Sequence, residues 1–512
     1  MNKRVLVAGI SIALAAATIL AACSGGSSSM TSGSSSMSGA SGVISGFGSV
    51  FVNGHEFATG MQTQVLDGDN DDAASSTSNL AVGMTVDVEA DGGTATMLRF
   101  TSAVRGEVDV VDTMHGMLTV LGQPVQTTSG TSFAGTVHGS GSTALTQLGD
   151  IGAGDHVIVF GYLECPTMGP VANPVASCIP GATTIVATLV YEPTSFSLYR
   201  VQGYVNGYNS STNSFNINAL TVDITSSTVC NMMMTCSFTN GDFVSVRSMT
   251  PPSGSLSANT LTLTADSIRK RSEAPTFAIG STVTIEGPVR QLNGTMFVVR
   301  GIQVNASGIA SSVAGLANNQ IVEVTGTIAS DGTLMATSIE VEQHATFAVM
   351  GSVGTVSGMT FSVLGLSFTV TDKTRFGDWL AGEQPFNSAN FASVLKSGDQ
   401  VIVAAYPSGG TNVATRVEVI PTPSSPTAAV EGVISGDDAP NDKMTVAGIM
   451  VTLNGSTKLF YPGAGSMPTL PGFFGAITPN TSIGGAIGMP GAGSAITAAD
   501  AAVLATGANW GD

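Results

Sequence analysis

The sequence contains 512 residues, of which only 10% are charged, and its formal net charge is −18 at pH 7. Typical soluble domains carry about 25% charged residues. A chain this acidic and this poor in lysine and arginine lacks the clustered cations that binding to nucleic acid or anionic lipid headgroups requires, so we expect neither kind of electrostatic partner.

The first 22 residues have the order of a secretory signal peptide. Lys3 and Arg4 precede an uncharged apolar run over residues 5–20, which is shorter than a membrane-spanning helix requires. The run ends in Leu-Ala-Ala before Cys23, an order that resembles the lipobox of bacterial lipoproteins. The resemblance implies that Cys23 is lipidated and anchors the protein in a lipid bilayer. The alternative is an ordinary secretory signal followed by a chance cysteine.

The residues after the cysteine suggest a location in the cell and a flexible tether. Ser24 stands where lipoproteins held at the inner membrane often have aspartate, so the lipoprotein resemblance favours the outer membrane, on its periplasmic or surface face. Residues 23–42 are rich in glycine and serine and contain no charge, which is typical of a flexible tether. We therefore expect a lipid-anchored protein of the cell envelope.

After the tether, one pattern recurs six times along the chain. Five copies and a degenerate sixth copy with a Gly-, Ala- and Pro-rich end span residues 43–103, 104–193, 199–269, 277–342, 346–420 and 427–512. Each copy opens with an apolar stretch around a glycine, such as VRGEV at residues 104–108. An alternating strand with a central glycine or small residue follows, such as LTVLGQPVQT at residues 118–127. We expect that glycine to let a curved strand bend at a barrel corner.

A second motif closes each copy. It has the form G-[DM]-x-V-x-V at Gly83, Gly154, Gly241 and Gly398, becomes NQIVEV at Asn319, and has no clear counterpart in the sixth copy. The glycine suits a turn with positive φ, and the aspartate suits a local hydrogen bond. A closing strand follows, and these alternating strands bounded by turn residues predict small antiparallel β-barrels. The one helix that we expect after the signal peptide covers residues 498–505.

The repeats resemble a known bacterial family. The phrase GFGSVFVNGHEF at residues 46–57, and the GDxVxV motif with an ATxI-like closing strand, are similar to the family catalogued as domain of unknown function 5666. The resemblance covers residues 43–420 and continues more weakly to residue 459. It implies an all-β fold of tandem OB-like barrels and assigns no activity. The sequence leaves open whether the barrels stack rigidly or are loosely strung.

Four cysteines follow Cys23, and they form two local pairs. Cys165 and Cys178 lie in one repeat, and Cys230 and Cys236 lie in the next. An even number of cysteines in an exported protein indicates disulfides, and we favour these two local pairings.

Two segments are candidate metal sites. Asp67, Asp69 and Asp71 alternate as in the first half of a calcium-binding loop, although the expected glycine and final glutamate are missing. The alternative is a solvated acidic turn between strands. The segment CNMMMTC at residues 230–236 combines thiols and thioethers that suit Cu(I), and the alternative is a disulfide-closed hairpin loop with methionine as filling.

The remaining candidates are weaker. The histidines (His55, His115, His138, His156 and His344) have no local metal-ligand spacing. Trp379 lies in the most aromatic variable loop, which either binds a ligand or is tucked onto its own barrel.

The common sequence motifs of nucleophilic, phosphate-binding and zinc-dependent enzymes are missing from the sequence. We therefore expect no enzymatic activity and no cofactor. The favoured hypothesis is a non-catalytic envelope protein that binds or scaffolds an envelope protein or polysaccharide. A metal-binding envelope lipoprotein and an unrecognised envelope hydrolase are the alternatives.

Overall fold

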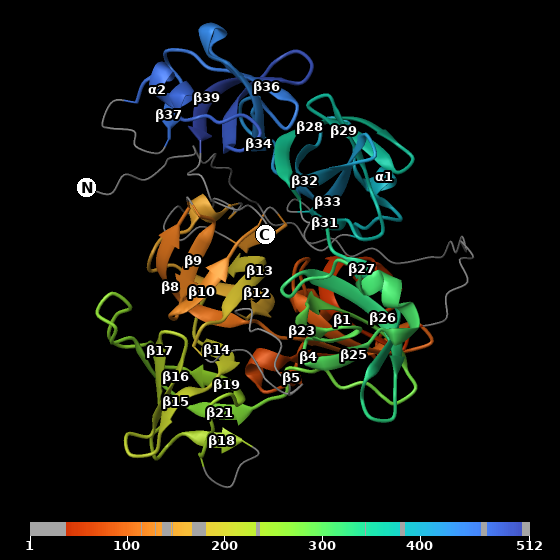
Figure 1. The fold of residues 1–512 in the computed structure, drawn as a ribbon, viewed down its shortest axis with the longest axis vertical. Coiled ribbons are helices and arrows are strands. Elements are labelled where there is room, and N and C mark those ends of the chain that lie inside the picture. The colour runs from red at the N-terminus through yellow and green to blue at the C-terminus, as the bar shows by residue number, and fades with distance from the viewer. Residues whose placement is uncertain are drawn as a thin grey trace.

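The computed structural model describes residues 37–113, 115–128, 130–135, 145, 147–165, 181–231, 236–343, 345–378, 385–461 and 468–503. Within these ranges β-strands dominate, and they form six small barrels of one topology (Figure 1), which confirms the all-β repeat prediction. The helices are short: α1 Phe391–Val394, α2 Leu470–Gly475, and the 3-10 turns η1 Gly68–Asn70, η2 Thr77–Asn79, η3 Leu148–Asp150, η4 Ser307–Val313 and η5 Ala439–Asn441. No helix in the described ranges has the length and apolar character needed to cross a membrane.

Barrel 2 illustrates the shared topology. Its strands are β8 Val104–Asp112, β9 Met117–Val120, β10 Gln123–Gln126, β11 Ser132–Gly135, β12 His156–Glu164 and β13 Thr184–Glu192. The strand β8 pairs antiparallel with both β9 and β12, β9 and β10 form a hairpin, β10 runs parallel to β13, and β13 pairs with β12. The ring β8-β9-β10-β13-β12 is therefore closed, while β11 adds a parallel pairing to β13. Closure leaves no long free edge on the barrel.

The other five barrels repeat this order. Barrel 1 has β1 Gly39–Gly46, β2 Val50–Val52, β3 His55–Phe57, β4 Gln64–Asp67, β5 Ala73–Ala74, β6 Thr85–Asp91 and β7 Thr94–Phe100. Barrel 3 has β14 Tyr199–Tyr204, β15 Asn206–Asn209, β16 Ser214–Ile217, β17 Leu220–Asp223, β18 Val229–Asn231, β19 Phe243–Ser248, β20 Thr262–Thr264 and β21 Ser267–Lys270. Barrel 4 has β22 Thr282–Pro288, β23 Arg290–Asn293, β24 Met296–Val299, β25 Ile302–Asn305, β26 Ile321–Ile328 and β27 Leu334–Val341. Barrel 5 has β28 Phe347–Ser357, β29 Thr360–Val363, β30 Leu366–Thr369, β31 Arg375–Asp378, β32 Gln400–Ser408 and β33 Thr411–Ile420. Barrel 6 has β34 Ala428–Asp438, β35 Lys443–Val446, β36 Ile449–Thr452, β37 Lys458–Phe460, β38 Ile483–Pro490 and β39 Ala495–Val503.

The glycine at the centre of the alternating segment that follows the opening motif has a different role from the one expected. Leu121 and Gly122 lie in a two-residue turn between β9 and β10, with φ angles of 48° and 68°. Two positive φ angles are typical of the tight hairpin turn whose twist matches the flanking strands. The prediction of one bent strand is therefore wrong, and the segment is a β-hairpin. The opening glycine makes room for it, since a Cβ on Gly106 would lie 2.3 Å from the Leu121 Cγ.

The second motif behaves as expected. Gly398 has a φ of 95°, its amide donates to the Val353 carbonyl at 2.8 Å, and the Asp399 carboxylate accepts from the Lys396 amide at 2.7 Å. Asn319, which replaces the glycine in barrel 4, also takes a positive φ of 69°. Asparagine tolerates this region better than most residues, so the departure in sequence preserves the turn.

Barrel 6 is complete. Asn480 has a φ of 62°, and its amide donates to the Ile434 carbonyl at 2.8 Å, which is the bond that the anchor glycine makes elsewhere. The strand β38 follows it and pairs with β34 and β39. The sixth copy therefore folds as a barrel although its sequence lacks a clear second motif. The expected helix at residues 498–505 is wrong, because Ala498 lies inside β39.

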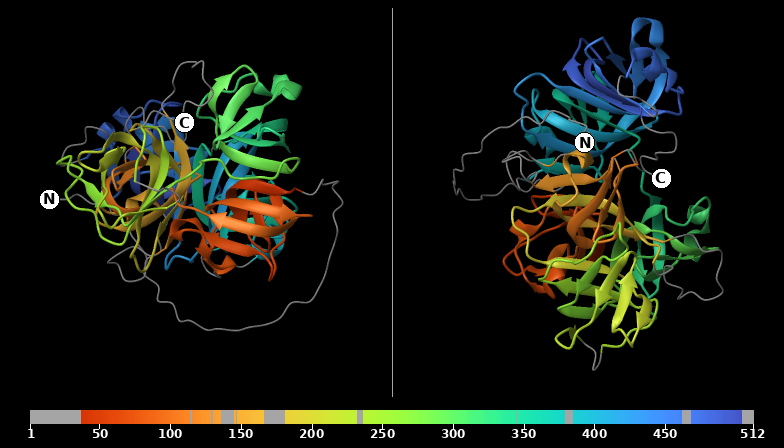
Figure 2. Two further views of the ribbon diagram at one scale, coloured as in Figure 1. Left: turned by 90° about the horizontal axis from the view of Figure 1, so that it is seen from below. Right: turned by 90° about the vertical axis from the view of Figure 1, so that its left-hand side faces the viewer.

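Two of the three pairings between barrels follow the sequence order, and the third does not. The first strands join barrels 2 and 3 through β8 and β14, barrels 5 and 6 through β28 and β34, and barrels 1 and 4 through the parallel pair β1 and β22. Figures 1 and 2 show barrel 4 beside barrel 1 although two barrels separate them in sequence. The predicted tether at residues 23–42 is too long by its last four residues, because β1 begins at Gly39 and pairs with β6 and β22.

The hydrophobic cores follow the same pairing. Barrels 2 and 3 share one continuous cluster of buried residues, and barrels 5 and 6 share another. The core of barrel 1 includes three residues of barrel 2, Ile158, Phe160 and Leu189. The six barrels therefore form one packed assembly.

Candidate functional site

The acidic loop of barrel 1 forms buried contacts. The Asp67 carboxylate accepts a hydrogen bond from the Asp69 amide at 2.9 Å and caps η1. The Asp69 side chain is 2% exposed; its Oδ1 accepts from the Ser102 amide at 2.9 Å and lies 3.3 Å from Nη1 of Arg200. Arg200 belongs to barrel 3 and is completely buried. These partners hold Asp69 inside an interface between barrels.

The next two carboxylates face further arginines of barrel 3. Asp71 forms ion pairs with Arg247 and with Arg269, the second at 3.4 Å. Asp72 lies 3.2 Å from Arg269 and 3.5 Å from Arg271. The loop thus joins barrel 1 to barrel 3 by opposite charge. The described residues include no group of three or more His, Cys, Asp or Glu side chains that could hold a metal ion, so the calcium hypothesis has no ligand set.

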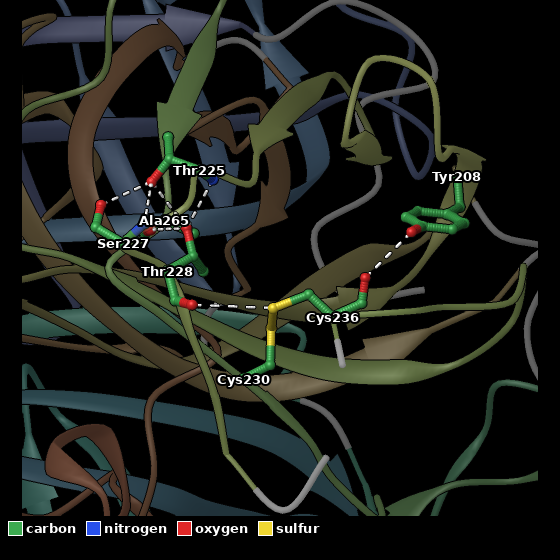
Figure 3. Close-up of a disulfide and its surroundings, with 7 residues drawn as sticks. All are labelled: Tyr208, Thr225, Ser227, Thr228, Cys230, Cys236 and Ala265. Carbon is green, nitrogen blue, oxygen red and sulfur yellow. Dashed lines mark hydrogen bonds between the residues drawn. A yellow bond between two sulfur atoms is a disulfide. The ribbon is translucent and has the colours of Figure 1, made fainter. Parts of the chain in front are cut away.

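The second metal candidate contains a disulfide between Cys230 and Cys236, the local pairing favoured from the sequence (Figure 3). The Tyr208 hydroxyl donates to the Cys236 carbonyl at 3.1 Å, and the Thr228 hydroxyl donates to the Ala265 carbonyl at 2.7 Å. The bond consumes both thiolates that a Cu(I) site would use. The intervening residues 232–235 lie outside the described ranges.

The other cysteine pair is described on one side only. Cys165 is disulfide-bonded and 8% exposed, and it packs with Tyr204 of barrel 3. Cys178, its expected partner, lies outside the described ranges. The same holds for the lipidation residue Cys23.

Trp379 also lies outside the described ranges, but its loop can be followed on both sides. Phe376 and Phe386 are buried with ring centroids 4.8 Å apart inside barrel 5. The following Asn387 donates from Nδ2 to the Phe47 carbonyl of barrel 1 at 2.9 Å. The described flanks of the loop are thus packed on its own barrel and on a neighbour.

The described histidines are dispersed. His55 lies in barrel 1, where burial lowers its pKa despite the nearby Asp372. His115 pairs with Asp112 at an exposed turn at 2.7 Å, and the His156 ring lies 4.6 Å from the Phe196 ring. His138 and His344 lie outside the described ranges. The histidines of the described ranges therefore offer no shared ligand set.

The most site-like feature is a polar cavity where barrels 2, 4 and 5 meet. We call the six residues Tyr162, Glu286, Glu323, Glu342, Lys373 and Arg375 the central junction. The cavity has a volume of about 40 Å³ and is lined by Thr128, Gly130, Tyr162, Val186, Ala187, Thr188, Glu286, Ile321, Glu342, Gln343, Ala345, Arg375 and Thr415. That volume accommodates roughly three water molecules, whereas pockets for organic ligands measure about 300 to 1,000 Å³. The clustered acids expected of a hydrolase are present, but the cavity is too small for a sugar ring.

One guanidinium lies between two carboxyl groups in this cavity. Nη2 of Arg375 lies 3.9 Å from Oε1 of Glu286 and 3.9 Å from Oε1 of Glu342, and Nη1 donates to the Gly130 carbonyl at 3.1 Å. The Glu286 carboxyl also accepts from the Val43 amide of barrel 1 at 3.4 Å. The members of the central junction therefore come from barrels 2, 4 and 5, and barrel 1 adds a backbone contact to it.

A second cation lies beside it. Nζ of Lys373 lies 3.0 Å from Glu323 and also pairs with Glu340 at the rim. Burial raises the pKa of Glu323 to about 7 despite Lys373, and burial together with the neighbouring Glu342 raises the pKa of Glu286 to about 7. Sequence reasoning missed this cluster because its members come from three repeats. The one available signal was a glutamate inside the otherwise uncharged strand β22.

The comparisons identify one family. A family model described as "Domain of unknown function (DUF5666)" matches residues 41–96, 105–165, 202–261, 286–340 and 350–418. The matches cover more than half of the chain and correspond to barrels 1 to 5. No curated protein matches the sequence.

Proposed function

Because the chain belongs to the family described as domain of unknown function DUF5666, and its repeats are packed into one assembly, we propose that it is a non-catalytic scaffold of the cell envelope. In this proposal acylated Cys23 anchors the chain in the bilayer, on the outer membrane, and residues 24–38 hold the barrels away from it. The barrels present their variable loops to another envelope component, a protein or a polysaccharide.

The observation that carries the proposal is the backbone pairing between the first strands of different barrels. Each barrel is closed, and its first strand joins a partner barrel through further backbone pairing. Such an assembly resists deformation because separating two barrels breaks backbone hydrogen bonds and exposes apolar surface. A rigid frame with loops of different length and composition supports a binding role, since binding residues concentrate in loops held by a rigid scaffold.

The experiment is a pull-down from native envelope with the mature chain, carrying Cys23→Ser and intact disulfides. We expect one specific protein or polysaccharide to be retained. A chain unfolded by reduction and denaturant is the matched control, since its composition is identical but its loops are no longer held. Retention equal to that of the control, or none at all, would contradict a binding role.

The anchor needs a separate measurement. Intact-mass analysis of the membrane-extracted protein should show an N-terminus at residue 23 carrying acyl chains, and the Cys23→Ser variant should fractionate without the membrane. Two or more acyl chains bind stably because each buried CH₂ contributes about 0.8 kcal/mol. An unmodified cysteine at that position would refute the anchor.

A further inference from the structure

The central junction contains more acid than base. Glu286 and Glu323 are 5% and 8% exposed, the Glu342 side chain beside them is 22% exposed, and the cations paired with these three carboxylates are Lys373 and Arg375. Full ionisation would leave at least one uncompensated carboxylate inside a contact between barrels. An unpaired buried charge is costly, and a buried carboxyl group instead takes up a proton.

The geometry shows which contact between barrels the uncompensated charge would destabilise. All three glutamates belong to barrel 4 or the residue after it, whereas both cations lie on the short segment of barrel 5 that leads into β31. The charged side chains therefore face each other across the boundary between barrels 4 and 5. Arg375 extends the same contact to the Gly130 carbonyl of barrel 2.

The surroundings add few compensating charges. The other titratable or charged groups that face the cluster from the neighbouring elements are His55, Tyr162, Arg300, Glu340 and Asp372. Two of these are acids, and burial lowers the pKa of His55. Barrel 5 is otherwise held on barrel 1 by neutral bonds such as that from Asn387 to the Phe47 carbonyl. These neutral bonds do not respond to pH.

We propose that the central junction is a proton-operated contact, which holds barrel 5 firmly against barrels 2 and 4 when its glutamates are protonated and loosens when they ionise.

The direction of the pH dependence follows from the raised pKa values. The carboxyl groups of Glu286 and Glu323 have pKa values of about 7 in the assembled protein, against an ordinary value of 4.5. Between these two values the assembled form binds protons that the separated form has released. The contact therefore weakens as the pH rises from about 4.5 to about 7 and changes little above that.

The test is small-angle scattering and sedimentation velocity of the full mature chain with Cys23→Ser, from pH 5 to pH 8.5. We expect the radius of gyration to rise and the sedimentation coefficient to fall as the pH rises from 5 to about 7, and both to level off above that. The double variant Glu286→Gln/Glu323→Gln should stay compact across the range, because a neutral amide replaces the protonated carboxyl group. Glu89→Gln, an exposed change on β6, should retain the wild-type transition.

A second variant extends the pH range of the transition. Lys373→Met removes the cation that favours ionised Glu323, so the pKa of Glu323 rises and the contact should go on weakening to a higher pH than in the wild type. A wild-type chain of constant dimensions from pH 5 to pH 8.5 would overturn the proposal. So would a transition that persists unchanged in both the double variant and Lys373→Met.

Discussion

At the scale of single residues, the acidic loop shows how an aspartate-rich segment can be structural. Asp69, Asp71 and Asp72 meet arginines of barrel 3. Of the aspartates whose spacing suggests calcium, Asp69 and Asp71 therefore pair with arginines. Arg269 is shared between Asp71 and Asp72. The innermost pair, Asp69 and Arg200, is removed from water on both sides. Its energetics depend on keeping both partners, since removing either one leaves the other buried without its ion-pair partner.

Replacing Asp69 with alanine should destabilise the contact between barrels 1 and 3. The change leaves the buried Arg200 guanidinium without its carboxylate and the Ser102 amide without its acceptor. Removing one partner of a buried ion pair costs about 3 to 5 kcal/mol. Chemical denaturation followed by circular dichroism should show an earlier transition for Asp69→Ala than for wild type.

Two control variants test whether the lost stability comes from the ion pair between Asp69 and Arg200. Asp91→Ala, at an exposed end of β6, should leave the transition unchanged. The double variant Asp69→Ala/Arg200→Met should recover part of the loss because no unpaired charge remains. A double variant less stable than Asp69→Ala would argue that Arg200 acts through its bonds to Ser102 and Gln202 instead.

At the scale of elements, barrels 2, 3 and 5 each fold a hairpin over a glycine of the first strand. A Cβ on Gly106 would meet the Leu121 side chain, one on Gly203 would lie 2.5 Å from Ile217, and one on Gly351 would lie 3.1 Å from Leu364. The glycine in the opening motif of these barrels is thus explained by the hairpin residue that crosses it. The first strand can curve tightly because nothing projects from it at this point.

Gly106→Ala should therefore destabilise barrel 2. The added methyl group would lie 2.3 Å from the Leu121 Cγ, which is close to the backbone and cannot move aside freely. Overpacking of this kind costs about 1 to 3 kcal/mol. The measurement is thermal unfolding of the full chain. In a Leu121→Ala background the same change should cost clearly less, since most of the colliding side chain is gone.

A glycine in a similar setting serves as the control. Gly436 lies in the first strand of barrel 6, and a Cβ there would have no neighbour within 4 Å. Gly436→Ala should be neutral or slightly stabilising because it lowers the entropy of the unfolded chain. Equal costs for Gly106→Ala in the wild-type and Leu121→Ala backgrounds would show that the clash is not the cause.

Some of the turns can be predicted from the sequence and others cannot, and the difference lies in the residue types at the turn positions. The anchor turns are predictable because glycine followed by aspartate specifies both a positive φ and a capping bond. The hairpin turns are hidden because Leu121 and Arg300 take positive φ angles that their residue types rarely adopt, whereas Asn53-Gly54 carries the usual signature. The sixth anchor is hidden because Asn480 replaces the glycine.

At the scale of the whole molecule, the order of barrels in space differs from their order in the chain. The strand β1 is paired with β22 of barrel 4, and the acidic loop of barrel 1 pairs with barrel 3. Repetition in a sequence predicts the repeating barrel but not which barrels are in contact. Those contacts depend on a few backbone pairings between first strands and on single ion pairs. The central junction was unpredictable for the same reason, since its glutamates and cations meet only after the barrels have assembled.

This arrangement predicts which parts of the chain can fold alone. Barrels 5 and 6 share one hydrophobic cluster and one continuous sheet, so a fragment of residues 345–503 retains its own core. Barrel 1 completes its core with Ile158, Phe160 and Leu189 from barrel 2 and pairs with barrel 4. We therefore expect the fragment 345–503 to unfold cooperatively and to give dispersed amide resonances, whereas a fragment of residues 37–103 should not.

A fragment of residues 37–343 supplies the control, because it restores to barrel 1 its contacts with barrels 2, 3 and 4 and should recover a cooperative transition. Small domains of about 60 residues are marginally stable because they bury a small share of their surface, so losing three core side chains to the missing neighbour should be decisive. Cooperative unfolding of the isolated fragment 37–103 would mean that its contacts with the other barrels add little. The chain would then act as independent units, and a deletion of barrel 4 would leave barrel 1 intact.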